Sequence, residues 1–287
     1  MSFSNEPLES RLFLDATATL GSHGVFKVSG TDNGETIEIS LDSGGTNVQA
    51  SVDGTVIGTA AATDVKAIVV NAGAGDDTVT VDSAITQRVY VSGGDGNDTI
   101  TVNSPKGAVS GGAGNDTIST TGAGPYVING GADSDTVTAG DGNNYISGGS
   151  GDDSITAGNG RNKINGGDDN DVIVAGTGNN NIDGGAGDDT ITAGAAGGTG
   201  KNTVNGGPGA DTITAIGSES HLLGGSGNDS ITGSAGNDTI FGGDGTDSVD
   251  GGSGGTDSVN QDNPPRAKHG HFRFRFGRGF ESESHRR

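Results

Sequence analysis

A single large apolar residue set between small polar residues recurs along most of the chain. In "GGAGNDTIS" (residues 111–119), Ile118 stands between two hydroxyl residues and follows a glycine-rich run and an Asp. Nearly the same phrase, "GGDGNDTIT", occurs eighteen residues earlier, at 93–101. An apolar residue flanked by polar ones is typical of a short strand with one buried face. Each phrase therefore predicts a three-residue strand whose middle side chain points inward.

The phrases align as a nine-residue repeat, G1-G2-x3-G4-x5-D6-x7-U8-x9, where U is a large apolar residue. Their spacing is 18 residues, with one step of 19 and one of 22. Extra small residues in "AGAAGGTGKN" explain the longest step, and they predict a bulging turn that leaves the following strands in phase. The strong copies begin at Gly93, Gly111, Gly130, Gly148, Gly166, Gly184, Gly206, Gly224 and Gly242.

A second set of nines lies between the strong copies, so that two nines make one coil of eighteen. In "AGDGNNYIS" (139–147) and its relatives, the sixth position is Asn instead of Asp: Asn144, Asn162, Asn180 and Asn202. The inward apolar residues of the two sets then face each other across the coil. On the strong side they are Ile100, Ile118, Val137, Ile155, Ile173, Ile191, Ile213, Ile231 and Val249, and on the other side they include Ile146, Ile164, Ile182, Val204 and Ile240.

The composition disfavours a conventional globular core. Of 287 residues, 58 are Gly, only 29% are hydrophobic, and Cys and Trp are absent. The net charge of −22 is uneven, because residues 261–287 carry seven Lys/Arg and three Asp/Glu. The acidic body repels nucleic acid and anionic membranes, and no apolar run is long enough for a membrane span. The first residues lack the pattern of a standard secretory leader.

Two inward apolar residues per coil are a thin core for eighteen ordered residues, so the repeat needs further stabilisation. Gly at positions one, two and four permits positive φ angles in a tight turn and lets backbone carbonyls converge. An Asp carboxylate together with such carbonyls forms an anionic site of oxygen ligands only. Such a site suits Ca²⁺ better than zinc or copper.

The repeat resembles the RTX, or hemolysin-type, calcium-binding nonapeptide family over roughly residues 72–260. The resemblance implies an all-β fold, a right-handed parallel β-roll, with ions between successive turns held by the sixth-position Asp and by loop carbonyls. Asp133 and Asp169 depart from the pattern at the fourth position, and Pro208 departs at the third. The candidate ligands are Asp77, Gly93, Gly96, Asp98, Gly111, Gly114, Asp116, Gly130, Asp135, Gly148, Gly151, Asp153, Gly166, Asp171, Gly184, Gly187, Asp189, Gly206, Gly209, Asp211, Gly224, Gly227, Asp229, Asp238, Gly242, Gly245, Asp247 and Asp257.

The division between Asp and Asn predicts that the two edges of the roll differ. Nine stacked Asp loops offer about eight gaps for calcium, whereas the facing edge is neutral from 144 to 202 and becomes acidic only at Asp238 and Asp257. We expect one calcium row, opposite a ladder of Asn side chains bonded to backbone. The alternative is that Asn also binds through its carbonyl, which would give about fifteen ions in two rows.

The remaining segments flank the repeat. We interpret residues 1–23 as a leader or a disordered tail. We interpret residues 24–71 as irregular, longer β-coils that lead into the roll at 72–260. Residues 261–287 form a basic tail in which Phe and Arg alternate. Three roles are open for this tail: a cap over the last coil, binding of a polyanion such as lipopolysaccharide or another surface polysaccharide, or a secretion signal.

The sequence predicts no enzyme. Residues 251–255 fit G-x-S-x-G around Ser253, but they lie within a repeat loop, not in a strand-to-helix elbow. A detached repeat domain of a secreted hydrolase remains an alternative. So does an ice- or crystal-binding solenoid, because outward Thr-x-Thr pairs such as Thr99 and Thr101 form a regular array similar to that of ice-binding solenoids. The favoured interpretation is a secreted or surface protein that folds on calcium binding and serves as a structural or adhesin-like module.

Overall fold

The computed structural model describes residues 16–261, and every regular element in that range is a β-strand. The strands form two sheets of thirteen, here named sheet A and sheet B. No helix long and apolar enough to cross a membrane occurs in that range. The leader expected at 1–23 falls mostly outside the described residues, and the basic tail lies almost wholly outside them.

Sheet A contains the longer strands, which run through the first glycines of each repeat. In spatial order it comprises β1 (Thr17–Leu20), β2 (Val25–Ser29), β6 (Ala67–Ala74), β8 (Arg88–Asp95), β10 (Gly107–Ala113), β12 (Tyr126–Ala132), β14 (Tyr145–Ser150), β16 (Lys163–Asp168), β18 (Asn181–Ala186), β20 (Lys201–Pro208), β22 (Glu219–Ser226), β24 (Thr239–Asp244) and β26 (Ser258–Asn260). Because these strands include glycine positions, most are longer than the three residues expected from the sequence.

Sheet B contains the strands that follow each sixth-position residue of the strong copies. In spatial order it comprises β5 (Thr55–Ala61), β4 (Asn47–Val52), β3 (Thr36–Leu41), β7 (Thr78–Val81), β9 (Thr99–Val102), β11 (Thr117–Thr120), β13 (Thr136–Ala139), β15 (Ser154–Ala157), β17 (Val172–Ala175), β19 (Thr190–Ala193), β21 (Thr212–Ala215), β23 (Ser230–Thr232) and β25 (Ser248–Asp250).

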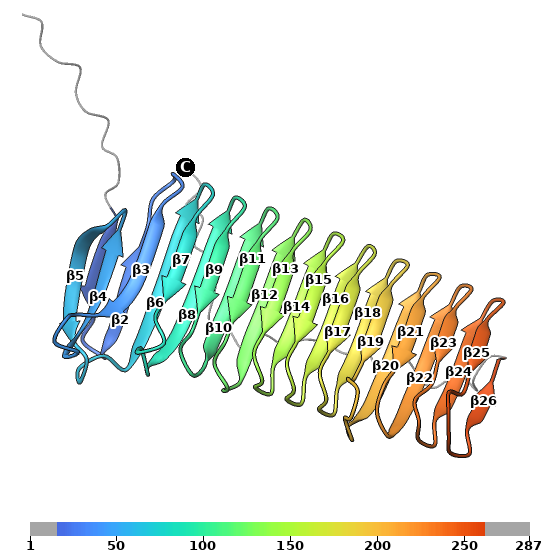
Figure 1. Cartoon of the computed structure of the whole chain (residues 1–287). Helices are drawn as coiled ribbons and strands as arrows, with labels where there is room; N and C mark the ends of the chain where they lie inside the picture. The colour runs from blue at the N-terminus through green and yellow to red at the C-terminus, as the bar shows by residue number, and fades with distance from the viewer. Residues whose placement is uncertain (1–15, 262–287) are drawn as a thin grey trace, which may run out of the picture.

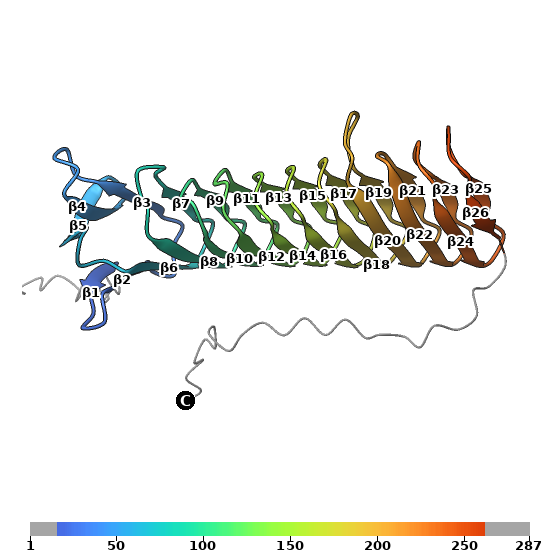
Figure 2. The ribbon, with the colours of Figure 1, turned by 90° about the horizontal axis from the view of Figure 1, so that it is seen from below.

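The chain alternates between the two sheets, so one strand from each makes a coil. Coils stack by parallel pairing of equivalent repeat positions: Ile118 pairs with Ile100 on one side and with Val137 on the other. Eleven coils, from β2–β3 to β24–β25, form the elongated stack in Figures 1 and 2. The predicted all-β parallel roll with a repeat of about 18 residues is confirmed.

The N-terminal end of the stack departs from this regular pattern. β1 pairs with β2 in the antiparallel sense, and β3, β4 and β5 form an antiparallel meander before the chain returns to sheet A at β6. The first coil is thus interrupted by two extra strands. The outermost strands at this end, β1 and β5, are antiparallel additions and not further turns of the roll.

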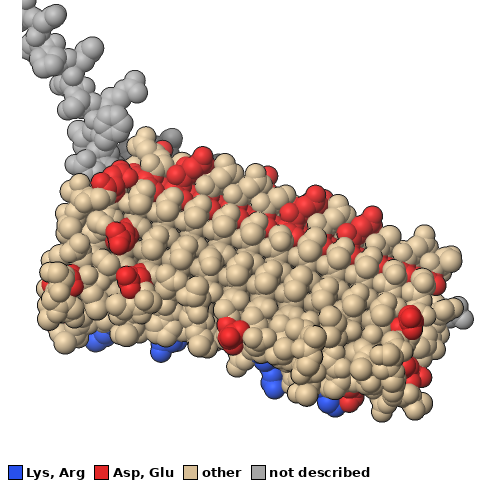
Figure 3. Space-filling model, in the orientation of Figure 1, with Lys and Arg blue, Asp and Glu red and all other residues tan. Residues whose placement is uncertain are grey.

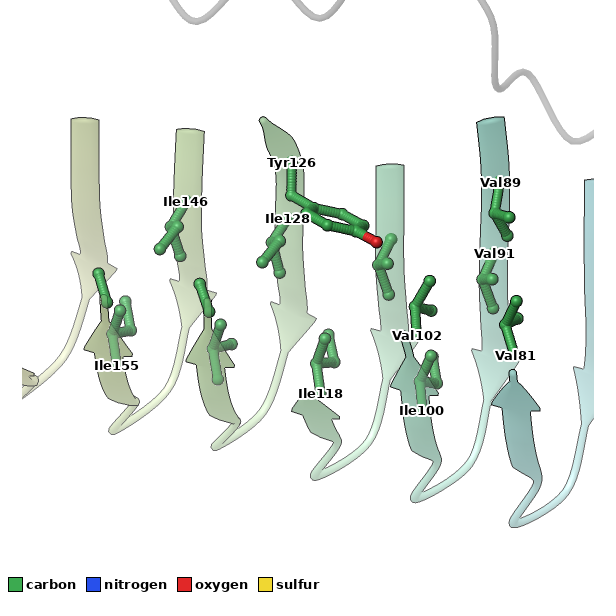
Figure 4. Close-up of a cluster of buried hydrophobic side chains, with 14 of the residues drawn as sticks. Val81, Val89, Val91, Ile100, Val102, Ile118, Tyr126, Ile128, Ile146 and Ile155 are labelled. Atoms are coloured by element: carbon green, nitrogen blue, oxygen red, sulfur yellow. The ribbon is translucent and has the colours of Figure 1, made fainter. Parts of the chain in front are cut away.

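The interior is formed by the predicted inward residues of the eighth repeat positions. Each of those residues is at most 1% exposed, except Val249 in the last complete coil, which is partly buried. Figure 4 shows Ile100, Ile118 and Ile155 on one sheet facing Ile128 and Ile146 on the other. The insertion after β19 does not disturb this packing, since Ile191 pairs with Ile213 despite the step of 22 residues.

The core is thicker at its N-terminal end than the sequence pattern indicated. In the coil β6–β7 four branched residues are buried: Ile68, Val70, Val79 and Val81. From β14 onward, the equivalent of Val81 is Ala or Gly, and the equivalent of Ile68 is a polar sixth-position residue such as Asn144. The expectation of two branched apolar residues per coil therefore holds only for the later coils.

Candidate metal sites along the first edge

The turns that lead from sheet A into sheet B stack along one long edge, here called the first edge, and carry a column of Asp side chains. Nine of them are at most 2% exposed and Asp247 is partly buried. In each, Oδ1 accepts a hydrogen bond from the backbone N–H of the sixth-position residue one coil earlier; for example, Asp98 N donates to Asp116 Oδ1 at 2.8 Å. The column comprises Asp77, Asp98, Asp116, Asp135, Asp153, Asp171, Asp189, Asp211, Asp229 and Asp247.

The second carboxylate oxygen of every Asp in this column is buried and has no hydrogen-bond partner. Such an oxygen is costly to bury unless something compensates it. The same ten residues all show this feature, and no other Asp in residues 16–261 does. A row of unpaired anionic oxygens at a fixed interval is the feature expected of a row of cation ligands.

The first-position glycines leave space for these oxygens. A Cβ placed on Gly111 would lie 2.0 Å from Asp116 Oδ2 and 2.7 Å from the carbonyl oxygen of Gly130 in the next coil. The carboxylate and a backbone carbonyl thus converge on the glycine. The first position, expected to require positive φ, does not adopt it; there Gly is required because a side chain would collide with the carboxylate and carbonyl oxygens.

Positive φ occurs instead at the second and fourth positions of the first edge. Gly112 has a φ of 137° and Gly114 one of 110°. Asp133 and Asp169, which replace the fourth Gly, adopt φ angles of 71° and 74°, and Asp tolerates this region better than most residues. Both departures from the repeat therefore keep the shape of the turn.

Burial and like charge make the metal-free column unfavourable. Burial raises the pKa of Asp116 to about 6 and that of Asp135 to about 7, and the neighbouring carboxylates contribute to both shifts. The ion pair between Lys201 and Glu219 does not involve the column, and no Lys or Arg lies in the first-edge turns of residues 16–261. The column therefore requires positive charge that the described side chains do not supply.

The ligands available fit Ca²⁺. No three His, Asp or Glu side chains converge on one point in the described part of the chain, so carbonyls must complete any site. Carboxylate and carbonyl oxygens in a flexible loop are the ligands that Ca²⁺ prefers, whereas Mg²⁺ demands a stricter geometry. The residues present therefore fit calcium.

The structure adds Glu35 to the start of the column, which sequence reasoning missed. Its backbone N–H donates to Asp77 Oδ1 at 2.7 Å, so Glu35 occupies the sixth position of the first coil. Unlike the Asp residues, it turns both carboxylate oxygens back onto Thr31. "GTDNGETIE" at 30–38 carried the signal, but the repeat is degenerate there.

A second ladder runs along the first edge at the fifth repeat position. Its side-chain oxygens accept hydrogen bonds from backbone N–H groups of the following coil. For example, Asn115 N donates to Asn97 Oδ1 at 2.8 Å. This direction is opposite to that of the Asp ladder. Asp76, Asp152, Asn170, Asp188 and Asn228 act in the same way. The recurrent Asn or Asp before the sixth position was the available signal for this metal-independent cross-link.

The turns that lead from sheet B into sheet A form the second edge, and here Asn replaces Asp. Asn144 Nδ2 donates to the carbonyl oxygens of Gly140 and Gly142 at 2.9 and 3.0 Å, and Asn162 and Asn180 repeat these contacts. On this edge the amide group engages the converging loop carbonyls. Asn144 Nδ2 also reaches Asn162 Oδ1 at 3.2 Å, which links neighbouring coils.

The acidic end of the second edge differs from the first edge. Asp238 Oδ1 accepts Ser220 N at 2.7 Å, and Oδ2 accepts Ser234 N at 2.6 Å. Asp257 Oδ1 accepts Asp238 N at 3.0 Å. Both oxygens of Asp238 therefore have donors, unlike those of the first-edge Asp residues.

Ser253 of the G-x-S-x-G match is exposed in the turn between β25 and β26. A strand and not a helix follows it, so the surroundings of a nucleophile elbow are absent at this position. The candidate nucleophile therefore gains no support from its setting.

Comparison with known families agrees with this geometry. The profile of the RTX calcium-binding nonapeptide repeat (4 copies) matches residues 89–104, 109–122, 129–164, 165–196, 196–215 and 223–256. Searches among curated proteins and among solved structures find no match. Together these matched segments span more than half of the chain, which belongs to the RTX calcium-binding repeat family.

Proposed function

We propose that the chain is a secreted or cell-surface calcium-binding protein in which the Asp column of the first edge holds one row of ions. The observation that carries this proposal is the set of ten buried Oδ2 atoms without a partner. Bound calcium supplies the positive charge that the column lacks. The ligand residues are the sixth-position Asp side chains together with carbonyls of the glycine turns.

Calcium binding and folding are coupled in this proposal. Without cations, ten like-charged groups along one edge repel one another and oppose stacking of the coils. Such a chain stays extended where calcium is scarce and folds at extracellular calcium concentrations, for which a dissociation constant of about 10⁻⁴ to 10⁻³ M is suitable. The folded roll then serves as a rigid structural or adhesin-like module.

We propose about eight ions on the first edge, and a metal-free second edge from Asn144 to Asn202, because the Asn amides already bond the loop carbonyls. Asp238 and Asp257 are the proposed ligands of any second-edge site. Isothermal titration calorimetry with the full chain counts the ions. A stoichiometry of about fifteen would mean that both edges bind calcium and would overturn the one-row assignment.

Circular dichroism tests the coupling directly. We expect a β-rich spectrum and a cooperative melt in millimolar calcium, and loss of both in excess chelator at neutral pH. An unchanged spectrum and melting temperature in chelator would show that calcium is not required for the fold.

A second function is supported by the exposed face of sheet B. Outward Thr and Ser residues lie in register from β7 to β23; Thr117 pairs with Thr99 and Thr136, and Ser119 with Thr101 and Thr138. Val172 and Val174, 47% and 40% exposed, interrupt this array. We propose ice or crystal binding as the alternative role of this face. Thermal hysteresis in calcium buffer tests it, and absence of both hysteresis and recrystallisation inhibition would exclude it.

A further inference from the structure

The two ends of the roll are finished differently. At the N-terminal end, β1 lies antiparallel on β2, and β4 and β5 extend sheet B beyond β3. At the other end, on the right of Figure 1, β25 and β26 are the outermost strands of sheets B and A. Their outer edges meet no further strand within residues 16–261. Such edges present backbone N–H and C=O groups that can pair with another strand.

The interior of the roll is also uncovered at the C-terminal end. Val259 of β26 is in register with the fully buried Ile240, yet it is 44% exposed. Val249 of β25 is in register with Ile231 and is only partly buried. Equivalent residues from β11 to β22 are at most 1% exposed. A further strand over this end would remove apolar surface from water, and stacked repeats generally need a terminal cap.

The edge of β25 has an apolar side and an acidic side. In this three-residue strand Val249 points inward, while Ser248 and Asp250 point outward and are exposed. A strand that pairs with this edge places its side chains on the same two faces, because opposed residues in a ladder share a face. An apolar residue beside Val249 and a basic residue beside Asp250 would therefore match both sides.

The charge of the last coils also favours a basic partner. Residues 202–261 contain eight Asp or Glu and no Lys or Arg. Figure 3 shows acidic and no basic side chains at this end, on the right. Asp250 belongs to no proposed calcium site, so calcium binding leaves its charge in place. A basic segment would therefore be attracted to this end of the roll with or without calcium.

The segment that follows the described residues has the matching sequence pattern. Residues 262–287 contain seven Lys or Arg and three Asp or Glu, and "HFRFRF" at 271–276 alternates Phe with Arg. This alternation predicts a strand with Phe272, Phe274 and Phe276 on one face and Arg273 and Arg275 on the other. Phe and Arg are the types of residue that match the two sides of the β25 edge.

The connection to this segment is long enough. Phe241 of β24 is in register with Asn260, and six residues separate Phe241 from the start of β25. Ten residues, 261–270, separate Asn260 from His271, so the chain can cross from sheet A to sheet B as it does in the preceding coil. A short linker gives a tethered segment an effective concentration of about millimolar, which favours it over a second copy of the chain.

We propose that residues 271–276 pair with the free edge of β25 as the next strand of sheet B and cap the roll. Phe side chains then cover Val249 and Val259, and an Arg lies beside Asp250. The cap requires folded coils, and it goes beyond the proposed calcium binding because it assigns the basic tail to an intramolecular partner. Both ends of the roll are then closed by strands of the same chain.

Hydrogen exchange measured by mass spectrometry on the full chain in millimolar calcium tests the cap. In F272S/F274S/F276S, amides of β23 to β26 should exchange about tenfold faster or more than in the wild type. Those of β9 to β15 should be unchanged, because each coil contacts only its neighbours. F274S and F280S form a matched pair, since Phe280 lies outside the alternating segment. F280S should stay within about twofold of the wild type.

A charge exchange tests whether the tail pairs with β25. D250R should speed exchange in β25 and β26, and D250R/R273D/R275D should restore most of the protection, because opposite charges are again adjacent. The lost bond from Gly252 N to Asp250 Oδ1 would not be restored by changes in the tail. Absence of rescue would therefore overturn the pairing with β25.

The other occupants of this end give different results. Equal exchange of β23 to β26 in the wild type and the triple Phe variant would overturn the cap and favour polyanion binding or export as the role of the tail. Protection that rises with protein concentration, with a doubled mass in light scattering, would assign the cover to a second copy and would also overturn it.

Circular dichroism on each sample separates the cap from the calcium proposal. A chain that folds only with calcium, but whose last strands are insensitive to the Phe variants, contradicts only the cap. A chain that folds equally in chelator and shows the expected losses of protection contradicts only the calcium proposal.

Discussion

Asp98 donates its backbone N–H to Oδ1 of Asp116 at 2.8 Å, while Oδ2 of the same Asp116 carboxylate is buried without a partner. The two oxygens of one carboxylate therefore have different surroundings. Its first oxygen cross-links neighbouring coils, and its second faces the convergent carbonyls of the glycine turn. At the sixth position of the second edge, an Asn amide supplies a donor in place of the second anionic oxygen, as in the bond from Asn144 Nδ2 to Gly142 O.

Asp153→Asn should remove one ligand charge from the middle of the column while keeping the oxygen that accepts Asp135 N. We expect calorimetry to show a loss of about one to two ions and a severalfold rise in the calcium concentration at the folding midpoint. The matched control is Asp152→Asn, because Asp152 is exposed and accepts Asn170 N through Oδ1. Equal effects of the two variants would argue against Asp153 as a ligand.

Asn162→Ala should destabilise the roll independently of calcium. It removes the donors to Gly158 O and Gly160 O and leaves these partly buried carbonyls unpaired, for an expected loss of about 1 to 2 kcal/mol in the free energy of unfolding. Urea unfolding at two calcium concentrations that both keep the wild type folded should give the same loss. Asn159→Ala, at an exposed position, is the control and should have a smaller effect. A loss that disappears at high calcium would contradict a metal-free second edge.

Gly111→Ala should disrupt the first edge, because the added Cβ would lie 2.0 Å from Asp116 Oδ2 and 2.7 Å from Gly130 O. We expect a loss of about 2 kcal/mol or more in calcium, together with weaker calcium binding. Gly44→Ala is the matched change, since its Cβ would meet nothing closer than 3.7 Å. Thermal melts of both variants in calcium buffer give the comparison, and a Gly111 variant as stable as the Gly44 variant would refute the steric argument.

The effect of pH on folding should have opposite signs in chelator and in calcium. Burial raises the pKa of Asp135 and Asp171 to about 7 from an ordinary value of 3.8. The metal-free folded chain then binds protons more tightly than the unfolded chain, so this stabilisation is complete below pH 3.8 and is lost as the pH rises to about 7. Circular dichroism in chelator should show more β structure at acid pH than at neutral pH.

With calcium present, protons compete for the same oxygens. The calcium concentration needed for folding should therefore rise as the pH falls below about 7. A metal-free chain that gained structure with rising pH would contradict the raised pKa values.

Protection from hydrogen exchange should be graded along the roll. The coil β6–β7 buries four branched residues, among them Ile68 and Val81, whereas the coil β16–β17 has Asn162 and Ala175 at the corresponding positions. As calcium is lowered, amides of β14 to β19 should exchange before those of β6 to β9. Uniform exchange along the stack, measured by mass spectrometry, would show that the unequal core does not control local stability.

The sequence by itself determined the repeat, its period and the inward residues. Ile118 and Ile146 could be placed on facing strands because side chains alternate between the two faces of a strand. Only one face of each short strand can therefore be apolar. The Asp column and its likeness to a calcium repeat followed from the same alignment. The insertion before Lys201 was correctly predicted to be a bulging turn, because the repeat pattern resumes in phase after it.

Only the tertiary structure decided how each position acts, because contacts one coil away are 18 to 22 residues distant in sequence along most of the roll, and 42 between Glu35 and Asp77. It showed that Gly111 is needed for space and not for positive φ, that Glu35 begins the column, and that the Asn97 and Asp116 ladders run in opposite directions. It also showed that Val259 is 44% exposed at the end of the roll. A repeat pattern fixes which residues stack, but which atom of each side chain meets which neighbour depends on the path of the turns.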